Sequence, residues 1–168
     1  MLDFTKHPVR ITHMNTRIEE HGDQEVKMLD LRIEADLPNT VLDRFSPSLR
    51  ASLFGTDEAP ELVPDAQHLP HVKNPELGTL AWTGSYSPVS FHLHTDARSS
   101  KNDVRLKDAK LGKIRLRPKE GGTIGFIWRI QASPSVGDTD RIFNLLKHEV
   151  RATQETSEAV NVEDADDE

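Results

Sequence analysis

A strict alternation of apolar and polar residues constrains this chain more than any other feature. In residues 29–36 every second residue is apolar and the residues between are charged. The same period of two recurs in residues 123–131, where one face carries Ile124, Phe126, Trp128 and Ile130. Successive side chains of a strand point to opposite sides of a sheet, so this period predicts half-buried β-strands.

Similar segments predict further strands. Residues 8–19 and 26–36 form a predicted hairpin, because the polar loop at 20–25 contains Gly22, and Met28 beside Leu29 predicts a bulge. A turn is predicted at 118–122, which contains Gly121-Gly122. The other predicted strands are 79–84, 89–95, 104–107, 110–117 and a last one through Val150.

Two short helices complete the predicted fold. Asn39 or Thr40 is expected to cap the first, which Pro47 interrupts before a second turn through Ser48–Phe54. Asp138 or Thr139 is expected to cap the other. A proline-rich irregular segment, 55–78, lies between them. The chain is therefore predicted to be a β-rich α+β protein, with about seven antiparallel strands in a sandwich or open barrel.

The charge is distributed unevenly along the 168 residues. Residues 152–168 hold seven carboxylates and no Lys or Arg, whereas residues 1–151 hold 21 basic and 21 acidic groups. We therefore expect a single β-rich domain over 1–151 and a disordered acidic tail over 152–168.

The composition also excludes several classes of protein. With no cysteine, disulfides, thiolate metal sites and cysteine nucleophiles are impossible. No apolar run approaches the ~20 residues of a membrane span, and the N-terminal residues do not resemble a signal peptide. These features favour a protein of the cytoplasm with no membrane partner.

The strongest local feature is basic. Residues 97–120 carry nine Lys or Arg against three acids. On a strand, Lys113, Arg115 and Arg117 share one face, and Arg105 and Lys107 repeat the pattern on the strand predicted before it. Paired side by side, the two strands would form a basic ladder, for which a phosphate backbone is one counter-anion. The alternative is an ordinary solvent-exposed edge of a sheet.

Aromatic side chains are the second requirement of a surface that binds single-stranded nucleic acid, because bases stack on them. Trp82 and Tyr86 lie four residues apart, and we expect them to share a face if the strand continues through Gly84. The alternative is that the aromatic residues form the core.

Histidines provide the only pattern with metal-ligand spacing. In His92-Leu93-His94 both imidazoles share one face of a strand, and Asp96 lies on the same face. The spacing makes these three residues weak metal candidates. The chain has no phosphate-binding glycine loop and no nucleophile elbow, so we expect no bound metal, no cofactor and no enzymatic activity.

Two segments, LRIEADLPNTVLDRFSPSLRASLF (31–54) and LRPKEGGTIGFIWRIQ (116–131), resemble a group of small uncharacterised proteins of tailed bacteriophages and prophages. Genes of that group lie near replication and recombination genes, so the resemblance implies a nucleic-acid partner in the cytoplasm of a bacterial host cell. It implies nothing about catalysis and assigns no functional residue. The acidic tail resembles those of single-stranded-DNA-binding proteins. Those tails end in an aromatic residue, whereas this one ends in Asp166-Asp167-Glu168.

These observations lead to two hypotheses of function. In the first, a phage-type accessory protein binds nucleic acid, preferably single-stranded DNA, through the basic strands, and the acidic tail modulates access. In the second, the chain is a protein-interaction module, either a virion component or an inhibitor of a host enzyme, with segment 55–78 and the acidic tail as its interface. Self-association is compatible with both.

Overall fold

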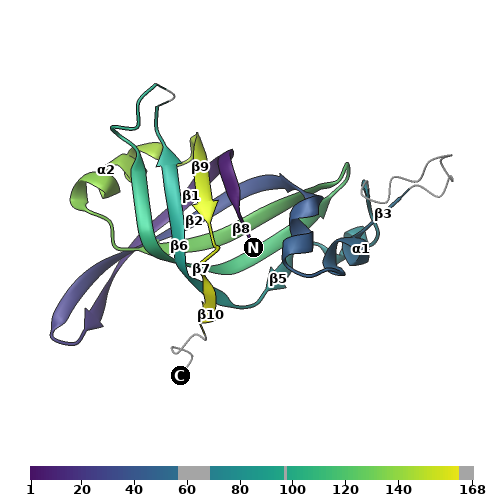
Figure 1. The fold of residues 1–168 in the computed structure, drawn as a ribbon, viewed down its shortest axis with the longest axis horizontal. Coiled ribbons are helices and arrows are strands. Elements are labelled where there is room, and N and C mark those ends of the chain that lie inside the picture. Colours follow the sequence, from purple (N-terminus) through teal and green to yellow (C-terminus); the bar gives the residue numbers. More distant parts are fainter. Residues whose placement is uncertain (57–68, 97, 163–168) are drawn as a thin grey trace.

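Long antiparallel strands make up most of the computed structural model, which describes residues 1–56, 69–96 and 98–162 (Figure 1). The strands are β1 (Phe4–His21), β2 (Gln24–Pro38), β3 (Phe54–Gly55), β4 (His71–Val72), β5 (Leu80–Trp82), β6 (Ser85–His94), β7 (Val104–Lys119), β8 (Thr123–Ala132), β9 (Glu149–Glu155) and β10 (Val160–Val162). The helices are η1 (Asn39–Arg44), α1 (Leu49–Leu53), η2 (Pro75–Leu77) and α2 (Val136–Leu145).

Six of these strands close into an antiparallel barrel in the order β6-β9-β1-β2-β8-β7, and β7 pairs back with β6. The predicted β-rich class is confirmed, and the barrel is closed rather than open. Closure follows from the length of β7, whose first half pairs with β6 and whose second half pairs with β8 and β5. β10 pairs with the first three residues of β6, 85–87.

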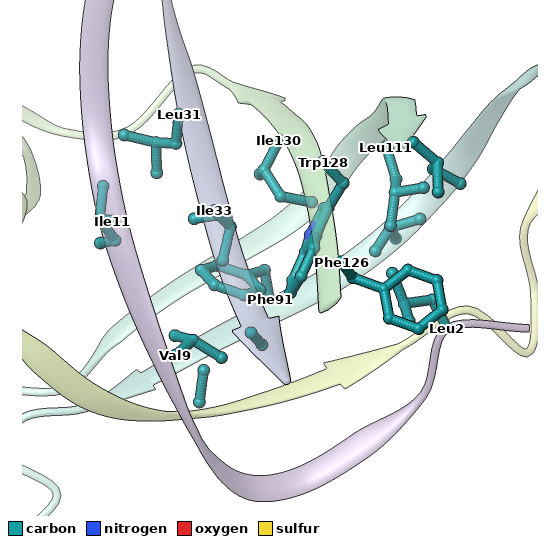
Figure 2. Packing of buried hydrophobic residues seen from close by; sticks show 14 of the residues in the cluster. Leu2, Val9, Ile11, Leu31, Ile33, Phe91, Leu111, Phe126, Trp128 and Ile130 are labelled. Atoms are coloured by element: carbon teal, nitrogen blue, oxygen red, sulfur yellow. The ribbon is translucent and has the colours of Figure 1, made fainter. Parts of the chain in front are cut away.

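The interior is filled by the apolar side chains that the alternation predicted. On the paired strands β2 and β8, Leu31 lies beside Ile130 and Ile33 lies beside Trp128. All four side chains are buried (Figure 2). The polar side chain of Gln154 is buried beside Trp128. The Trp128 indole N–H donates to Gln154 Oε1 at 3.0 Å, and Gln154 Nε2 donates to the Leu2 carbonyl at 2.7 Å.

Strand β7 corrects one prediction. Residues 104–107 and 110–117 belong to one continuous strand, so they do not pair with each other. The break expected between them is a β-bulge, where Asp108 adopts φ +56° and the register with β6 shifts. A second bulge, at Lys113 with φ +51°, shifts the register with β8. The predicted bulge at Met28 is wrong, since the irregularity lies in β1 between Ile11 and His13.

The predicted boundary after Arg151 is also wrong. β9 lies between β1 and β6 within the barrel, and β10 extends the sheet. Ala152 and Gln154 point inward and are buried, and their small or polar nature hid the strand from the sequence pattern. Only Glu155 and Glu158 of the seven acids lie in the described part. The other five belong to 163–168, so the expectation of disorder there lies outside the described residues.

The connections agree with the predictions in part. The hairpins β1–β2 and β7–β8 are confirmed, and the second turns through Gly121 and Gly122 at φ +94° and +82°. Predicted caps were wrong: no side chain caps η1, and Ser135 Oγ accepts from the Asp138 N–H at the start of α2.

Segment 85–88 belongs to β6 instead of linking two strands. Residues 57–68 of the predicted irregular segment 55–78 lie outside the described residues. Among the described residues, no helix is long and apolar enough to span a membrane.

Candidate functional site

Cations from three strands gather on the outer wall of the barrel. Along the second half of β7, Ile114 and Leu116 point inward, so Lys113, Arg115 and Arg117 point outward and are exposed, as predicted. The register of the sheet adds two arginines. Arg129 of β8 lies opposite Gly112 of β7, and Arg32 of β2 lies opposite Arg129. We call these five residues the basic face: Arg32, Lys113, Arg115, Arg117 and Arg129.

The basic face lines two adjoining depressions. One, of about 260 Å³, is lined by Arg32, Lys113 and Arg129 together with His13 of β1. The other, of about 590 Å³, is lined by Arg115 and Arg117. Arg115 and Ile127 line both depressions, so the two adjoin each other on the wall formed by β1, β2, β8 and β7.

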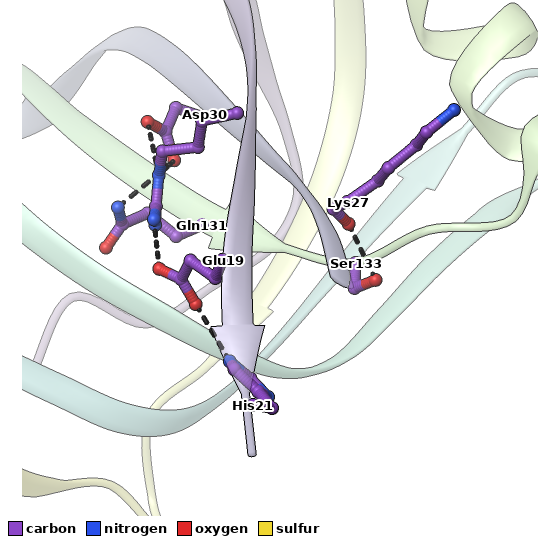
Figure 3. Close-up of polar contacts among 7 residues, drawn as sticks. Glu19, His21, Lys27, Asp30, Gln131 and Ser133 are labelled. Atoms are coloured by element: carbon purple, nitrogen blue, oxygen red, sulfur yellow. Dashed lines mark hydrogen bonds and ion pairs between the residues drawn. The ribbon is translucent and has the colours of Figure 1, made fainter. Parts of the chain in front are cut away.

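The acids near the basic face are partly occupied by other partners. Asp30 lines the smaller depression, but its carboxylate accepts hydrogen bonds from Arg17 Nε at 3.1 Å and from Gln131 Nε2 at 3.1 Å (Figure 3). Asp36 accepts from Lys119 Nζ at 2.8 Å. Glu34 lies 3.6 Å from a guanidinium nitrogen of Arg32. Lys119 and Arg32 thus have acidic neighbours.

The other four cations of the basic face share the depressions with acids such as Asp30 and Asp36 but form no ion pair with them. Within the described part of the chain, Lys113, Arg115, Arg117 and Arg129 form no ion pair, and Arg129 Nε is buried with no hydrogen-bond partner. A buried N–H without a partner costs about 1–3 kcal/mol, and like charges directly opposite on neighbouring strands are destabilising. A bound anion would relieve the like-charge repulsion.

Two of the predicted basic residues lie elsewhere. Arg105 is paired with His92 of β6, and the bulge at Asp108 separates Arg105 and Lys107 from the second half of β7. Both are exposed on the outer wall beside β6, not beside β8. The predicted ladder of five cations on two strands is therefore replaced by five cations on β2, β7 and β8.

The aromatic pair is in contact but does not join the basic face. Trp82 Nε1 donates to the Tyr86 hydroxyl at 3.0 Å. Trp82 lies opposite Ile114 on the interior side of β5 and packs edge-on against Phe45 at 5.3 Å between ring centroids. Ala81, not Trp82, lies beside Arg115. Trp82 and Tyr86 therefore pack against the core, and neither is placed to stack bases bound at the basic face.

The histidine pair meets a different carboxylate from the one predicted. His92 and His94 stack with ring centroids 4.0 Å apart on the outer side of β6. Strand β6 ends at His94, and Asp96 accepts from the Arg98 N–H. The carboxylate that meets the two imidazoles is that of Asp103, which lies just before β7. Its Oδ2 lies 2.8 Å from His92 Nε2 and 3.6 Å from His94 Nδ1.

Asp103 is held as a carboxylate. Its side chain is only 3% exposed. Burial raises the pKa of Asp103, but the hydrogen bonds from His92 and from the Thr95 N–H lower it by more, so the pKa lies below its usual value. Burial and the charge of His92 lower the pKa of His94, against the opposing effect of Asp103.

Comparisons with known proteins return no match. No protein-family model, no curated protein and no solved structure is significantly similar to this chain.

Proposed function

We propose that this protein binds nucleic acid through the basic face, with single-stranded DNA as the preferred form. The observation that supports the proposal most is the opposed pair Arg32 and Arg129, which lines one of the two depressions and in which Arg129 forms no ion pair within the described residues. Phosphate oxygens would accept from such guanidinium groups and remove the like-charge repulsion. Most of the affinity would come from such backbone contacts, independently of sequence.

The shape of the surface favours a single strand. Reading the major groove of a duplex takes a protruding helix or ribbon that enters the groove. The basic face instead lines two adjoining depressions in the barrel wall. Neighbouring strands of a sheet are about 4.8 Å apart, so the cations of β2, β8 and β7 follow one another along a path suited to one phosphate backbone. Base stacking on Trp82 and Tyr86 is left out of this proposal.

The acidic residues of 163–168 enter the proposal as a competitor for the same surface. That segment contains five carboxylates and no base. Its charge equals in magnitude that of the five cations of the basic face. Nucleic acid and this segment would therefore compete, and the competition would weaken as salt screens both.

The test compares two double variants in a fluorescence titration with a labelled single-stranded oligonucleotide at 50 mM salt. Arg32→Gln/Arg129→Gln removes the opposed pair, and we expect its affinity to fall at least tenfold. Arg105→Gln/Lys107→Gln removes the same charge from the half of β7 beside β6 and is the matched control. We expect it to bind like the wild type. Equal losses in both variants would show that only the overall charge matters, which contradicts the proposed face.

A duplex of the same sequence in the same titration tests the preferred form. We expect the duplex to bind more weakly than the single strand. Tighter binding of the duplex would contradict the preference but not the basic face itself.

A further inference from the structure

The cluster of His92, His94 and Asp103 has the composition of a metal site and lies outside the basic face. One ligand atom from each residue lies within 4.8 Å of the other two. Two imidazoles and a carboxylate are a ligand set for divalent transition metals, since imidazole suits Zn²⁺, Fe²⁺ and Cu²⁺. The sequence pattern predicted Asp96 as the carboxylate of a weak candidate site and predicted no bound metal. It could not predict Asp103, because the sequence period does not show the turn that brings this residue back to β6.

The distances agree with a single ion at the centre of the cluster. Zinc binds nitrogen and oxygen at about 2.0–2.2 Å, so two ligands of one tetrahedral ion lie about 3.4 Å apart. Asp103 Oδ2 lies 2.8 Å from His92 Nε2 and 3.6 Å from His94 Nδ1. These two separations bracket the required value.

Hydrogen bonds around the cluster orient these ligands. With Nδ1 of His94 turned to Asp103, its Nε2 lies 2.8 Å from the Thr153 hydroxyl of β9. The other carboxylate oxygen of Asp103 accepts from the Thr95 N–H at 3.1 Å. Partners of this kind fix the ring orientation and the tautomer of ligating histidines.

The cluster is also accessible from solvent. The imidazoles of His92 and His94 are 21% and 17% exposed, whereas Asp103 lies beneath them at 3%. An ion held by the three residues would have at least one coordination position open to water. The positive charges of Lys6 and Arg105 act on His94, so the affinity should be lower than that of a closed four-ligand zinc site.

We propose that His92, His94 and Asp103 bind one divalent transition-metal ion, with Zn²⁺ as the fitting representative. The competing explanation is that the His92–Asp103 hydrogen bond only fastens the segment 95–103 to β6. The two explanations differ most at His94, which the fastening does not require but the metal does.

The test uses the full chain after treatment with chelator, titrated with Zn²⁺ by calorimetry and with Co²⁺ by visible absorption. We expect one ion per chain, d–d absorption from Co²⁺, and a higher melting temperature with Zn²⁺ than without. His94→Ala should bind at least tenfold more weakly and lose the thermal shift. His148→Ala, an exposed histidine outside the cluster, is the matched control and should behave like the wild type.

Asp103→Asn provides a second variant at the buried ligand. We expect weaker binding there too, and His94→Ala decides the matter if Asp103→Asn fails to fold. Absence of one-to-one binding in the wild type, or an equal loss in His94→Ala and His148→Ala, would overturn the metal site. Neither result bears on the basic face, which shares no residue with this cluster.

Discussion

Arg32 of β2 and Arg129 of β8 lie directly opposite each other on the outer wall of the barrel. Both belong to strands whose alternate residues fill the core, so the register keeps both side chains on the outer face. Glu34 lies near Arg32 at 3.6 Å, whereas Arg129 has no ion-pair partner in the described residues. The fold thus holds two like charges together at a cost that a bound anion would offset.

This cost predicts a gain in stability when Arg129 is neutralised. Opposed like charges cost roughly 0.2–1 kcal/mol. We expect Arg129→Gln to raise the free energy of unfolding by about 0.5 kcal/mol at low salt, and the gain should shrink at 0.5 M salt because the repulsion is screened. Urea denaturation at the two salt concentrations measures both effects. A loss of stability at low salt would mean that Arg129 has a stabilising partner.

The acidic segment predicts the effect of truncation. Ending the chain after Val162 removes five carboxylates and leaves β9 and β10 complete. We expect this truncation to tighten binding of a single-stranded oligonucleotide at 50 mM salt, and the gain to decrease with added salt. Truncation after Arg151 is unsuitable, because it removes buried Ala152 and Gln154 from the barrel. Weaker binding after truncation at Val162 would refute competition by the acidic segment.

The buried polar link predicts a stability effect at Gln154. Gln154→Leu leaves the Trp128 indole N–H and the Leu2 carbonyl without their partner, and each buried unpaired group costs about 1–3 kcal/mol. We expect the variant to lose about 2 kcal/mol or more in chemical denaturation. Adding Trp128→Phe removes the unpaired N–H, so the double variant should lose less than the sum of the single losses. Strict additivity would argue against the hydrogen bond.

The environment of Asp103 predicts acid sensitivity in chelator-treated protein. Its pKa is lower in the folded state than the usual 3.8, so the folded state binds fewer protons than the unfolded one. The resulting stability is complete above about pH 5 and is lost as the pH falls through 3.8 towards the folded pKa. Asp103→Asn should flatten that part of the pH profile of unfolding. Asn102→Ala, at an uncharged and exposed position in the same segment, is the control and should keep the wild-type profile.

Local patterns predicted the strands whose inward residues are large and apolar, and they failed where the inward residues are small or polar. The alternation in β2 and β8 was visible from residues such as Leu31 and Trp128. β9 was cut short because Ala152 and Gln154 point inward, and β7 was divided because the bulge at Asp108 resembles a turn.

The candidate sites depended on contacts between distant segments. Lys113, Arg115 and Arg117 follow from the alternation alone, but Arg32 and Arg129 join them only through the register of β2 with β8. Likewise, the period of two predicted that Asp96 continues the strand and shares a face with His92 and His94. The structure ends β6 at His94 and returns the chain so that Asp103 meets the two imidazoles. No periodicity within one segment contains that information.

The salt dependence of binding tests the central claim most directly. Each phosphate contact with single-stranded nucleic acid contributes about −0.7 to the slope of log K against log salt concentration, so five contacts predict a slope of about −3.5. Arg32→Gln/Arg129→Gln should reduce it to about −2.1, and Arg105→Gln/Lys107→Gln should leave it unchanged. A slope near zero for the wild-type protein, or no binding at 50 mM salt, would contradict nucleic-acid binding by the basic face.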